Sequence, residues 1–184
     1  MLKMLKTLCC FVLVIQICAA SVTPAAAQSK NYMTNSGFEE VYFITDRFTG
    51  PRPSGWDFLS NWGTSGYSIG IDSAQARTGK SSLRLAGDNP EVRIAAAQTV
   101  RGLDPDKYYR ISAYIKCENY TPSKISPSGP VIRVNCLGTS SYFLTDTIVK
   151  GGSSNTIDWT YAENIFTPGQ TDIRVDCIFD NGTG

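Results

Sequence analysis

Short runs of alternating apolar and polar residues limit most strongly how this chain can fold. Apolar residues recur at every second position, and long stripes with the helical period of about 3.6 residues are missing. The alternating segments are 82–86, 92–100, 109–117, 132–137 and 173–180. Residues two apart on a strand share one face, so the pattern predicts antiparallel strands with one buried and one wetter face.

An all-β fold of 184 residues closes most naturally as a two-sheet antiparallel sandwich or jelly roll. Gly, Pro, Asn and Asp gather in 49–55, 101–107, 121–130 and 150–155, which we predict as turns or loops. Asn181–Gly182 is a hairpin turn signal with no strand after it. We expect a sandwich that lacks its last strand; a frayed natural terminus is the alternative.

The N-terminus has the organisation of a secretory signal peptide. A short basic start precedes an apolar stretch over 8–20, and three alanines end at Ala27. We therefore divide the chain into a signal peptide, 1–27, and one domain, 28–184, and expect a secreted or periplasmic protein. The apolar stretch is shorter than the roughly 20 residues that span a bilayer. A lipid anchor at Cys18 is the minor alternative.

Charge and composition exclude several classes of function. The chain has 17 Lys and Arg, 16 Asp and Glu, and no His. Near-neutral charge without basic clusters argues against nucleic acid as a partner. The lack of His removes Ser-His-Asp and Cys-His catalysis and the common zinc hydrolase sites. The acids are scattered, so no pair of carboxylates at a spacing for glycoside hydrolysis is predicted.

Three cysteines remain beyond the signal peptide: Cys117, Cys136 and Cys177. An odd number allows at most one bridge, and each Cys lies on the apolar side of an alternating run. We favour three small buried core residues over a disulfide, which stays the alternative.

Several short motifs follow one another in a fixed order along residues 31–184. They are Asn-Ser-Gly-Phe-Glu-Glu at 35–40, Pro-Ser-Gly-Trp at 53–56, the segments 76–85 and 102–116, and Asp-Trp-Thr at 158–160. This order resembles the carbohydrate-binding module superfamily that includes families 4, 9 and 22. The resemblance implies a galactose-binding-like β-sandwich that binds polysaccharide or oligosaccharide and performs no catalysis.

The same resemblance implies a structural calcium ion. In many relatives the ion sits between the opening segment and a final strand with an Asp-Asp pair, which this sequence lacks. Glu39 is the side chain here that would help such a site, with backbone carbonyls near Lys80. Calcium takes about six to eight oxygen ligands. The alternative is that Glu39 only faces solvent.

Sugar recognition needs aromatic faces for the apolar side of a pyranose and planar polar groups for its hydroxyls. Trp62 and Tyr67 lie in a polar, Gly-rich segment and are the leading stacking candidates, with local packing as the alternative. Tyr142 is a further candidate in a polar context. Trp56 and Trp159 match family positions that look structural, and we expect both in the core.

The wetter faces of the predicted strands supply the polar candidates. Their planar donors and acceptors suit hydroxyl groups, and they are Arg110, Tyr114, Arg133, Asn135 and Arg174. If the strands pair as assumed, Arg110 and Tyr114 would neighbour Arg133 and Asn135, with Arg174 and Asp176 beside them. An outward sheet face is polar in any case, which is the alternative reading.

These observations predict a secreted, non-catalytic carbohydrate-binding module. It would hold an attached catalytic domain, such as a glycoside hydrolase lying beyond residue 184, close to polysaccharide. The alternative is a structural or adhesion sandwich without sugar affinity, because fold alone does not determine function.

Overall fold

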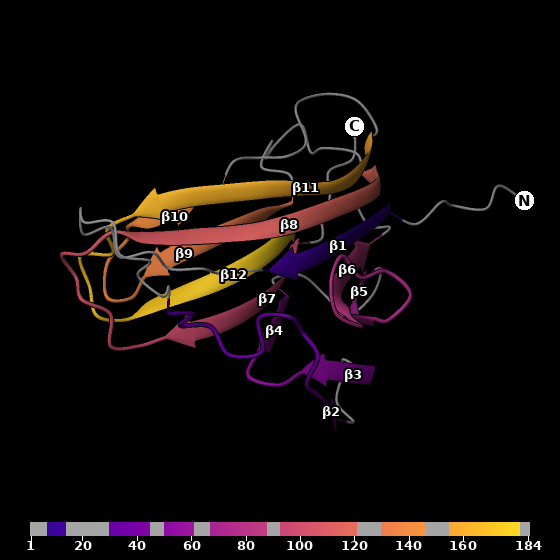
Figure 1. The fold of residues 1–184 in the computed structure, drawn as a ribbon, viewed down its shortest axis with the longest axis horizontal. Coiled ribbons are helices and arrows are strands. Elements are labelled where there is room, and N and C mark those ends of the chain that lie inside the picture. The colour runs from indigo at the N-terminus through magenta and orange to yellow at the C-terminus, as the bar shows by residue number, and fades with distance from the viewer. Residues whose placement is uncertain are drawn as a thin grey trace, which may run out of the picture.

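The computed structural model describes residues 7–13 by their backbone, together with 30–44, 50–60, 67–87, 93–120, 130–145 and 155–180. The described residues form an all-β fold of antiparallel sheets (Figure 1). The strands are β1 (Thr7–Leu13), β2 (Val41–Ile44), β3 (Gly50–Pro53), β4 (Asp57–Ser60), β5 (Tyr67–Asp72), β6 (Ser82–Gly87), β7 (Arg93–Val100), β8 (Tyr109–Tyr120), β9 (Val131–Cys136), β10 (Tyr142–Leu144), β11 (Asn155–Phe166) and β12 (Ile173–Asp180).

Two five-stranded sheets form the sandwich. One has the order β11-β8-β1-β6-β5 and is called the β8 sheet; the other has the order β10-β9-β12-β7-β4 and is called the β12 sheet. A short β2–β3 pair lies beside them, as Figure 1 shows. The predicted sandwich is confirmed, and the core lies between its two sheets.

Alternation produces the core as the sequence predicted. On β8, Ile111, Ala113 and Ile115 are buried in the core, while Arg110 and Tyr114 on the other side of the strand are only partly buried; Ser112 on that side is buried. On β9 burial alternates from Ile132 to Cys136, whereas on β12 Asp176 and Ile178 on the outward side are also buried. Burial of the apolar side of each strand stabilises the sandwich because it removes that surface from water.

The predicted core cysteines are confirmed. Cys117, Cys136 and Cys177 are all buried on β8, β9 and β12. Burial raises the pKa of the Cys136 and Cys177 thiols, because an apolar surrounding disfavours the thiolate. These two side chains therefore act as small apolar residues.

One segment differs from the sequence prediction. The segment 49–55 was predicted as a turn, but Gly50–Pro53 forms β3 and pairs with β2. Prolines suit such a strand because it belongs to a two-stranded pair in which few backbone donors are needed. The apolar stretch assigned to the signal peptide contributes β1 to the middle of the β8 sheet.

The opening segment is fastened to the sandwich by two polar side chains. Asn35 donates to the carbonyl oxygens of Glu40 at 2.7 Å and Ser54 at 3.1 Å. Gln98, buried on β7, donates to the carbonyl oxygens of Thr34 at 3.0 Å and Gly55 at 2.9 Å. Gln98 occupies a core-facing position of β7 because backbone groups from this segment satisfy its amide.

The two tryptophans expected in the core have different positions. Trp56 is 1% exposed, lies 5.1 Å from the Phe38 ring, and donates to the Asn35 carbonyl oxygen at 3.3 Å. Trp159 is half-buried, where the β11–β8 register shifts between Ile157 and Thr160. The expectation is confirmed for Trp56 and wrong for Trp159, because the bulge there disturbs the alternation.

Candidate functional site

The outward side of the β12 sheet carries three rows of side chains, which together we call the β12 face. Cross-strand partners in antiparallel sheets lie side by side on one face, so the register defines each row. The rows are Leu59–Ala95–Ile178–Val131, Asp57–Ala97–Asp176–Arg133–Leu144 and Thr99–Arg174–Asn135–Tyr142. The first row is apolar, the second is charged, and the third is polar with an aromatic end.

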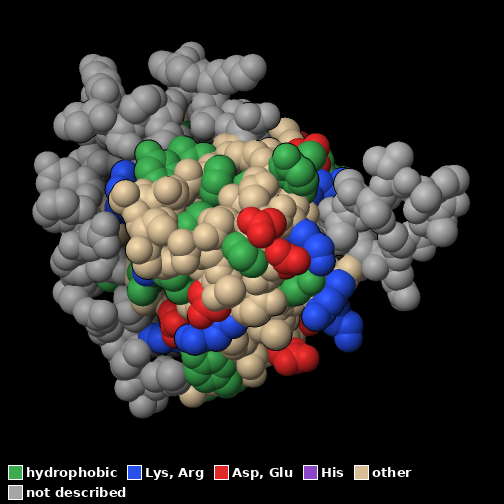
Figure 2. Space-filling view, turned by 90° about the vertical axis from the view of Figure 1, so that its left-hand side faces the viewer, with side chains coloured by type: hydrophobic (Ala, Val, Ile, Leu, Met, Phe, Trp, Pro, Cys, Tyr) green, Lys and Arg blue, Asp and Glu red, His purple; other side chains and the backbone are tan. Residues whose placement is uncertain are grey.

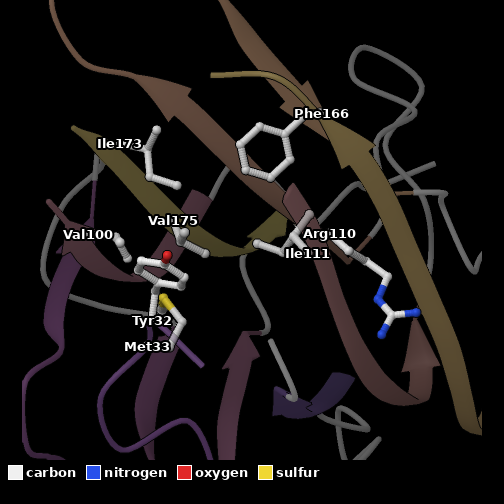
Figure 3. A pocket seen from close by; sticks show the side chains of 8 residues that line it. All are labelled: Tyr32, Met33, Val100, Arg110, Ile111, Phe166, Ile173 and Val175. Carbon is white, nitrogen blue, oxygen red and sulfur yellow. The ribbon is translucent and has the colours of Figure 1, made fainter. Parts of the chain in front are cut away.

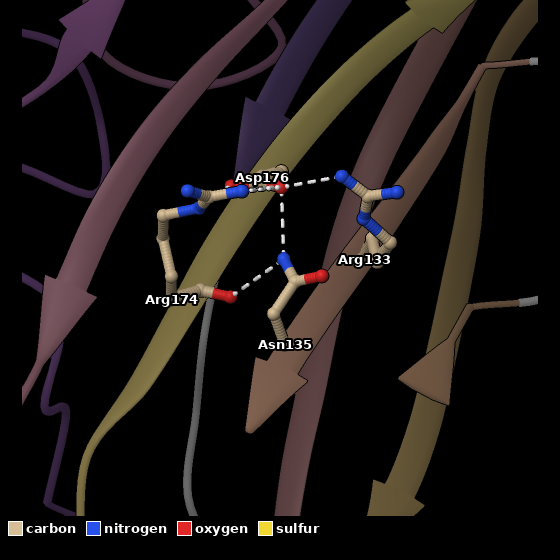
Figure 4. A network of polar contacts seen from close by, with 4 residues as sticks. All are labelled: Arg133, Asn135, Arg174 and Asp176. Atoms are coloured by element: carbon tan, nitrogen blue, oxygen red, sulfur yellow. Dashed lines mark hydrogen bonds and ion pairs between the residues drawn. The ribbon is translucent and has the colours of Figure 1, made fainter. Parts of the chain in front are cut away.

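Asp176 is the centre of this face. Its carboxylate is 1% exposed and accepts a forked pair of bonds from Arg174, Nε to Oδ1 at 2.8 Å and Nη2 to Oδ2 at 3.1 Å. Arg133 Nη2 donates to Oδ2 at 3.0 Å and Asn135 Nδ2 at 2.8 Å, as Figure 4 shows. One buried acid therefore orients two guanidinium groups and one amide.

The polar groups of this network keep capacity for a ligand. Arg133 and Arg174 are 29% and 38% exposed, so part of each guanidinium meets solvent. A hollow of about 50 Å³ opens beside them, with Leu59 and Ile178 in its lining. Guanidinium groups donate in a fixed plane, which suits oxygen acceptors on a polar ligand.

An exposed aromatic residue completes the third row. Tyr142 is 58% exposed and lies across from Asn135 in the β10–β9 register. Leu144 is the partner of Arg133 in the second row and is also exposed. The β12 face therefore offers an aromatic ring next to fixed amide and guanidinium groups.

The predicted site residues do not all meet. Arg133, Asn135, Tyr142 and Arg174 share the β12 face, as expected for the pairs on β9 and β12. The expected proximity of Arg110 and Tyr114 to Arg133 is wrong, because β8 belongs to the other sheet. Alternation assigns a residue to a face but does not say which strands will pair.

Arg110 and Tyr114 have partners on the outside of the β8 sheet. The guanidinium of Arg77 lies 3.3 Å from the centre of the Tyr114 ring, and the Tyr161 ring lies 5.2 Å away. Arg110 forms a 3.9 Å ion pair with Glu163 of β11. Arg77 covers Tyr114, which reduces the ring area available for stacking on a sugar.

Two stacking candidates have different outcomes. Tyr67 begins β5, is half-buried and packs against the core. This agrees with local packing, the alternative to sugar stacking in the sequence analysis. Trp62 lies outside the described residues, so its role stays a prediction.

A small apolar cavity lies between the sheets and is separate from the β12 face. Its walls include Tyr32, Met33 and Phe166, and its volume is about 10 Å³, room for about one water molecule. Figure 3 shows the guanidinium of Arg110 turned away from this apolar group. The cavity is too small for a sugar ring and is a gap in core packing.

Glu39 connects two segments of backbone. Its Oε1 accepts from the amides of Lys80 at 2.8 Å and Ser81 at 3.2 Å. Gly79 has a φ of 70°, and a Cβ atom there would collide with the Glu39 carboxylate. The amide groups near Lys80, rather than carbonyl oxygens, therefore face this carboxylate. Among the described residues, no group of three or more His, Cys, Asp or Glu could hold a metal ion.

Charged side chains of both signs are interspersed on the side of the molecule in Figure 2, and its hydrophobic side chains lie in several separate groups. The connection from β7 to β8 has the same mixture, with Lys107 paired to Asp104 at 3.1 Å. The hydrogen bond from the backbone amide of Asp106 is the larger cause of the lowered pKa of Asp104, and the bond from Lys107 lowers it further. The same bond to Asp104 raises the pKa of Lys107.

The fold defines the class of this protein as an antiparallel β-sandwich with a polar, partly aromatic outer sheet face. A family model described as a carbohydrate-binding domain, of the 4/9 type, matches residues 30–182. The chain belongs to this family of carbohydrate-binding domains. No curated protein matches it. Within the part of the chain that the structure describes, no helix is long and apolar enough to cross a membrane.

Sequence reasoning placed Asp176 beside Arg174 but did not recognise it as the centre of the site. Arg174 and Asp176 occupy alternate positions of one strand, a pattern that indicates a same-face ion pair. Thr99 and Leu144 became neighbours of the site only through strand pairing. No signal in the sequence alone identifies those two contacts.

Proposed function

We propose that the β12 face binds a polysaccharide or oligosaccharide. The observation that carries this is the exposed Tyr142 ring in the same row as Asn135 and Arg174, which Asp176 holds in place. A tyrosine ring can stack on the apolar side of a pyranose, while the amide and guanidinium groups meet its hydroxyls. Membership of a carbohydrate-binding family supports the same ligand class.

The donors on the β12 face are held in place before a ligand binds, and this preorganisation makes the face suitable for sugars. A flexible arginine loses rotamer entropy when it binds, at a cost of about 0.5–1.5 kcal/mol per side chain. The forked contact with Asp176 fixes the Arg174 side chain in the folded protein, so this entropy is lost on folding rather than on binding. The ligand therefore meets donors that already have their final orientation.

The cellular role is a finer part of the proposal. We infer that the domain is secreted or periplasmic and concentrates an attached catalytic domain, such as a glycoside hydrolase, on polysaccharide. The basic start, apolar stretch and alanines of residues 1–27 support export. The family is one of binding domains, so catalysis would belong to the attached domain.

A structural or adhesion sandwich is the second candidate. One observation favours it: Asp176 already occupies donors of both arginines and of Asn135, so the network also has a role in stability. Sugar binding by the folded chain separates the two candidates.

The test is affinity electrophoresis of the full chain in gels that contain β-glucan, xylan, mannan or pectin. We expect retardation on one polymer, and about tenfold weaker binding for Tyr142→Ala, the loss of about 1.4 kcal/mol of stacking. Tyr108→Ala is the matched control, because Tyr108 is an equally exposed tyrosine in the connection before β8. Free migration of the folded chain on every polymer would favour the structural role, and retained binding in Tyr142→Ala with loss in Trp62→Ala would move the site.

The calcium ion implied by family resemblance stays a prediction, tested by melting the chain in calcium chloride and in EDTA. Oε1 of Glu39 is held by two amides, so only Oε2 is available for a cation. If calcium binds, it stabilises the folded chain by about 2.7 kcal/mol at a calcium concentration one hundred times its Kd. The melting temperature then rises. The rise should be absent in Glu39→Gln. Equal melting in EDTA would leave Glu39 as an anchor for the 79–81 turn.

A further inference from the structure

The hollow on the β12 face has a basic lining. Among the described residues that line its volume of about 50 Å³, the charged ones are Arg93, Arg133, Arg174 and Asp176. The carboxylate of Asp176 is buried and already accepts four hydrogen bonds from its neighbours. Guanidinium groups stay charged in proteins, so one negative charge in the lining faces three positive ones.

A short side chain on β7 explains why the sheet is hollowed at this point. Ala95 occupies an outward position of β7, between Leu59 of β4 and Ile178 of β12 in the strand register. Arg93 lies two residues before Ala95, so it belongs to the same outward side. Because an alanine side chain ends at Cβ, the longer side chains around it leave space above it. The hollow therefore combines a small apolar floor with guanidinium groups.

Two further acids of this sheet count against the arginines. Asp57 of β4 is exposed and does not line the hollow. Asp180 of β12 is the Cα partner of Arg93. With Asp180 included, three cations stand against two acids, so the lining is positive in either count.

The two central arginines keep donors for a ligand. Arg133 contacts Asp176 through Nη2, and Arg174 contacts it through Nε and Nη2. These contacts leave Nη1 of both guanidinium groups unused. The Nε atom of Arg133 is buried and has no hydrogen-bond partner within the part of the chain that the structure describes. A buried donor without a partner indicates a missing acceptor such as water or an ion, so Asp176 alone does not satisfy Arg133.

We propose that this hollow takes the carboxylate of a uronic acid unit, so that the polysaccharide bound on the β12 face is acidic. This assignment rests on the proposed function of the face and specifies its ligand class. A carboxylate is planar and has two oxygen atoms, which match the planar donors of a guanidinium group. The apolar floor at Leu59 and Ile178 meets the ring of the same sugar unit. Tyr142, in the same row as Arg174, stacks on the same sugar chain.

The carboxylate is the part of the ligand that these arginines favour most. A neutral polysaccharide offers only hydroxyl oxygens, and hydrogen bonds between ionised partners are roughly twice as strong as those between neutral ones. Arg133 and Arg174 are only partly exposed, so salt screens their charge less than that of a fully exposed side chain. We therefore expect the carboxylate to supply most of the affinity.

The test is affinity electrophoresis of the full chain in paired gels. One gel of each pair contains polygalacturonate, alginate or glucuronoxylan, and the other contains the same polymer after chemical reduction of its carboxyl groups to alcohols. The two polymers of a pair share their linkages and differ in the carboxylate. We expect one acidic polymer to bind at least tenfold more tightly than its reduced form.

A variant of Arg93 tests the place of the carboxylate. Arg93 takes no part in the hydrogen bonds of Asp176, so Arg93→Gln removes a charge from the lining and keeps that network. It should weaken binding of the acidic polymer at least tenfold and binding of the reduced polymer much less. Arg101→Gln is the matched control, because Arg101 is an exposed arginine beyond the end of β7, paired with Asp172 at 3.9 Å. It should change neither.

The outcomes separate this site from sugar binding in general. Equal binding of an acidic polymer and its reduced form would overturn the carboxylate site and leave sugar binding on the β12 face intact. Equal retardation by dextran sulfate would also overturn it, because attraction between charges would then suffice. Equal losses in Arg93→Gln and Arg101→Gln would exclude the hollow as the place of the carboxylate. Free migration of the folded chain on every acidic and neutral polymer would overturn the proposed function together with this site.

Discussion

Replacement of Asp176 by Ala is expected to lower the free energy of unfolding by about 2–3 kcal/mol and to abolish sugar retardation in the gel. The carboxylate is buried and accepts four hydrogen bonds, two from Arg174 and one each from Arg133 and Asn135. Its removal leaves two neighbouring guanidinium groups without their shared anion. Breaking a buried ion pair costs about 3–5 kcal/mol, and solvent around the partly exposed arginines reduces that figure.

Urea unfolding of the full chain measures the effect, with Glu163→Ala as the control. Glu163 is an ion-paired acid on the outside of the other sheet, and its exposed 3.9 Å contact with Arg110 predicts a change within about 1 kcal/mol. Asp176→Asn preserves the shape of the side chain and should remain folded, with weaker binding because the fork on Arg174 loses its charge. Full sugar binding by Asp176→Asn would show that the network serves stability alone.

Replacement of Trp56 by Ala is expected to have the largest effect on stability, a loss of about 3–5 kcal/mol. The ring is 1% exposed and packs on Phe38, and its Nε1 group donates to the Asn35 carbonyl oxygen. The substitution leaves a cavity at the point where the opening segment meets β4, and the Asn35 carbonyl oxygen keeps only its bond from the Phe38 amide. Domains have a free energy of unfolding of about 5–15 kcal/mol, so this loss is a large share of the total and would partly unfold a domain at the lower end of that range.

The same change at Trp159 provides the comparison. Trp159 is half-buried beside the β11 bulge, so we expect Trp159→Ala to cost about 1 kcal/mol. Trp56→Phe should recover part of the loss, because it refills most of the volume without the hydrogen bond. Equal unfolding free energies for Trp56→Ala and Trp159→Ala would contradict the assigned core position.

The strands with strict alternation were predictable because apolar residues at every second position of a single strand show which of its faces is buried. Tyr109–Cys117 and Ile173–Phe179 each place apolar residues at every second position, and both form strands with that side in the core. The burial of Cys177 and the outward position of Arg174 follow from the same pattern. Short strands such as β10 and β3 carry too few residues for a period to be visible.

The amino-acid sequence alone determined the all-β class, the inner and outer side of each regular strand, and the family to which the chain belongs. Only the tertiary structure decided that Asn135 and Arg174 share a face with Tyr142 while Tyr114 lies on the other sheet. It also placed Thr7–Leu13 between β6 and β8. The physical reason is that alternation is a local property of one strand. Pairing joins backbone edges that are far apart in the chain, and it depends on which other strands are available as partners.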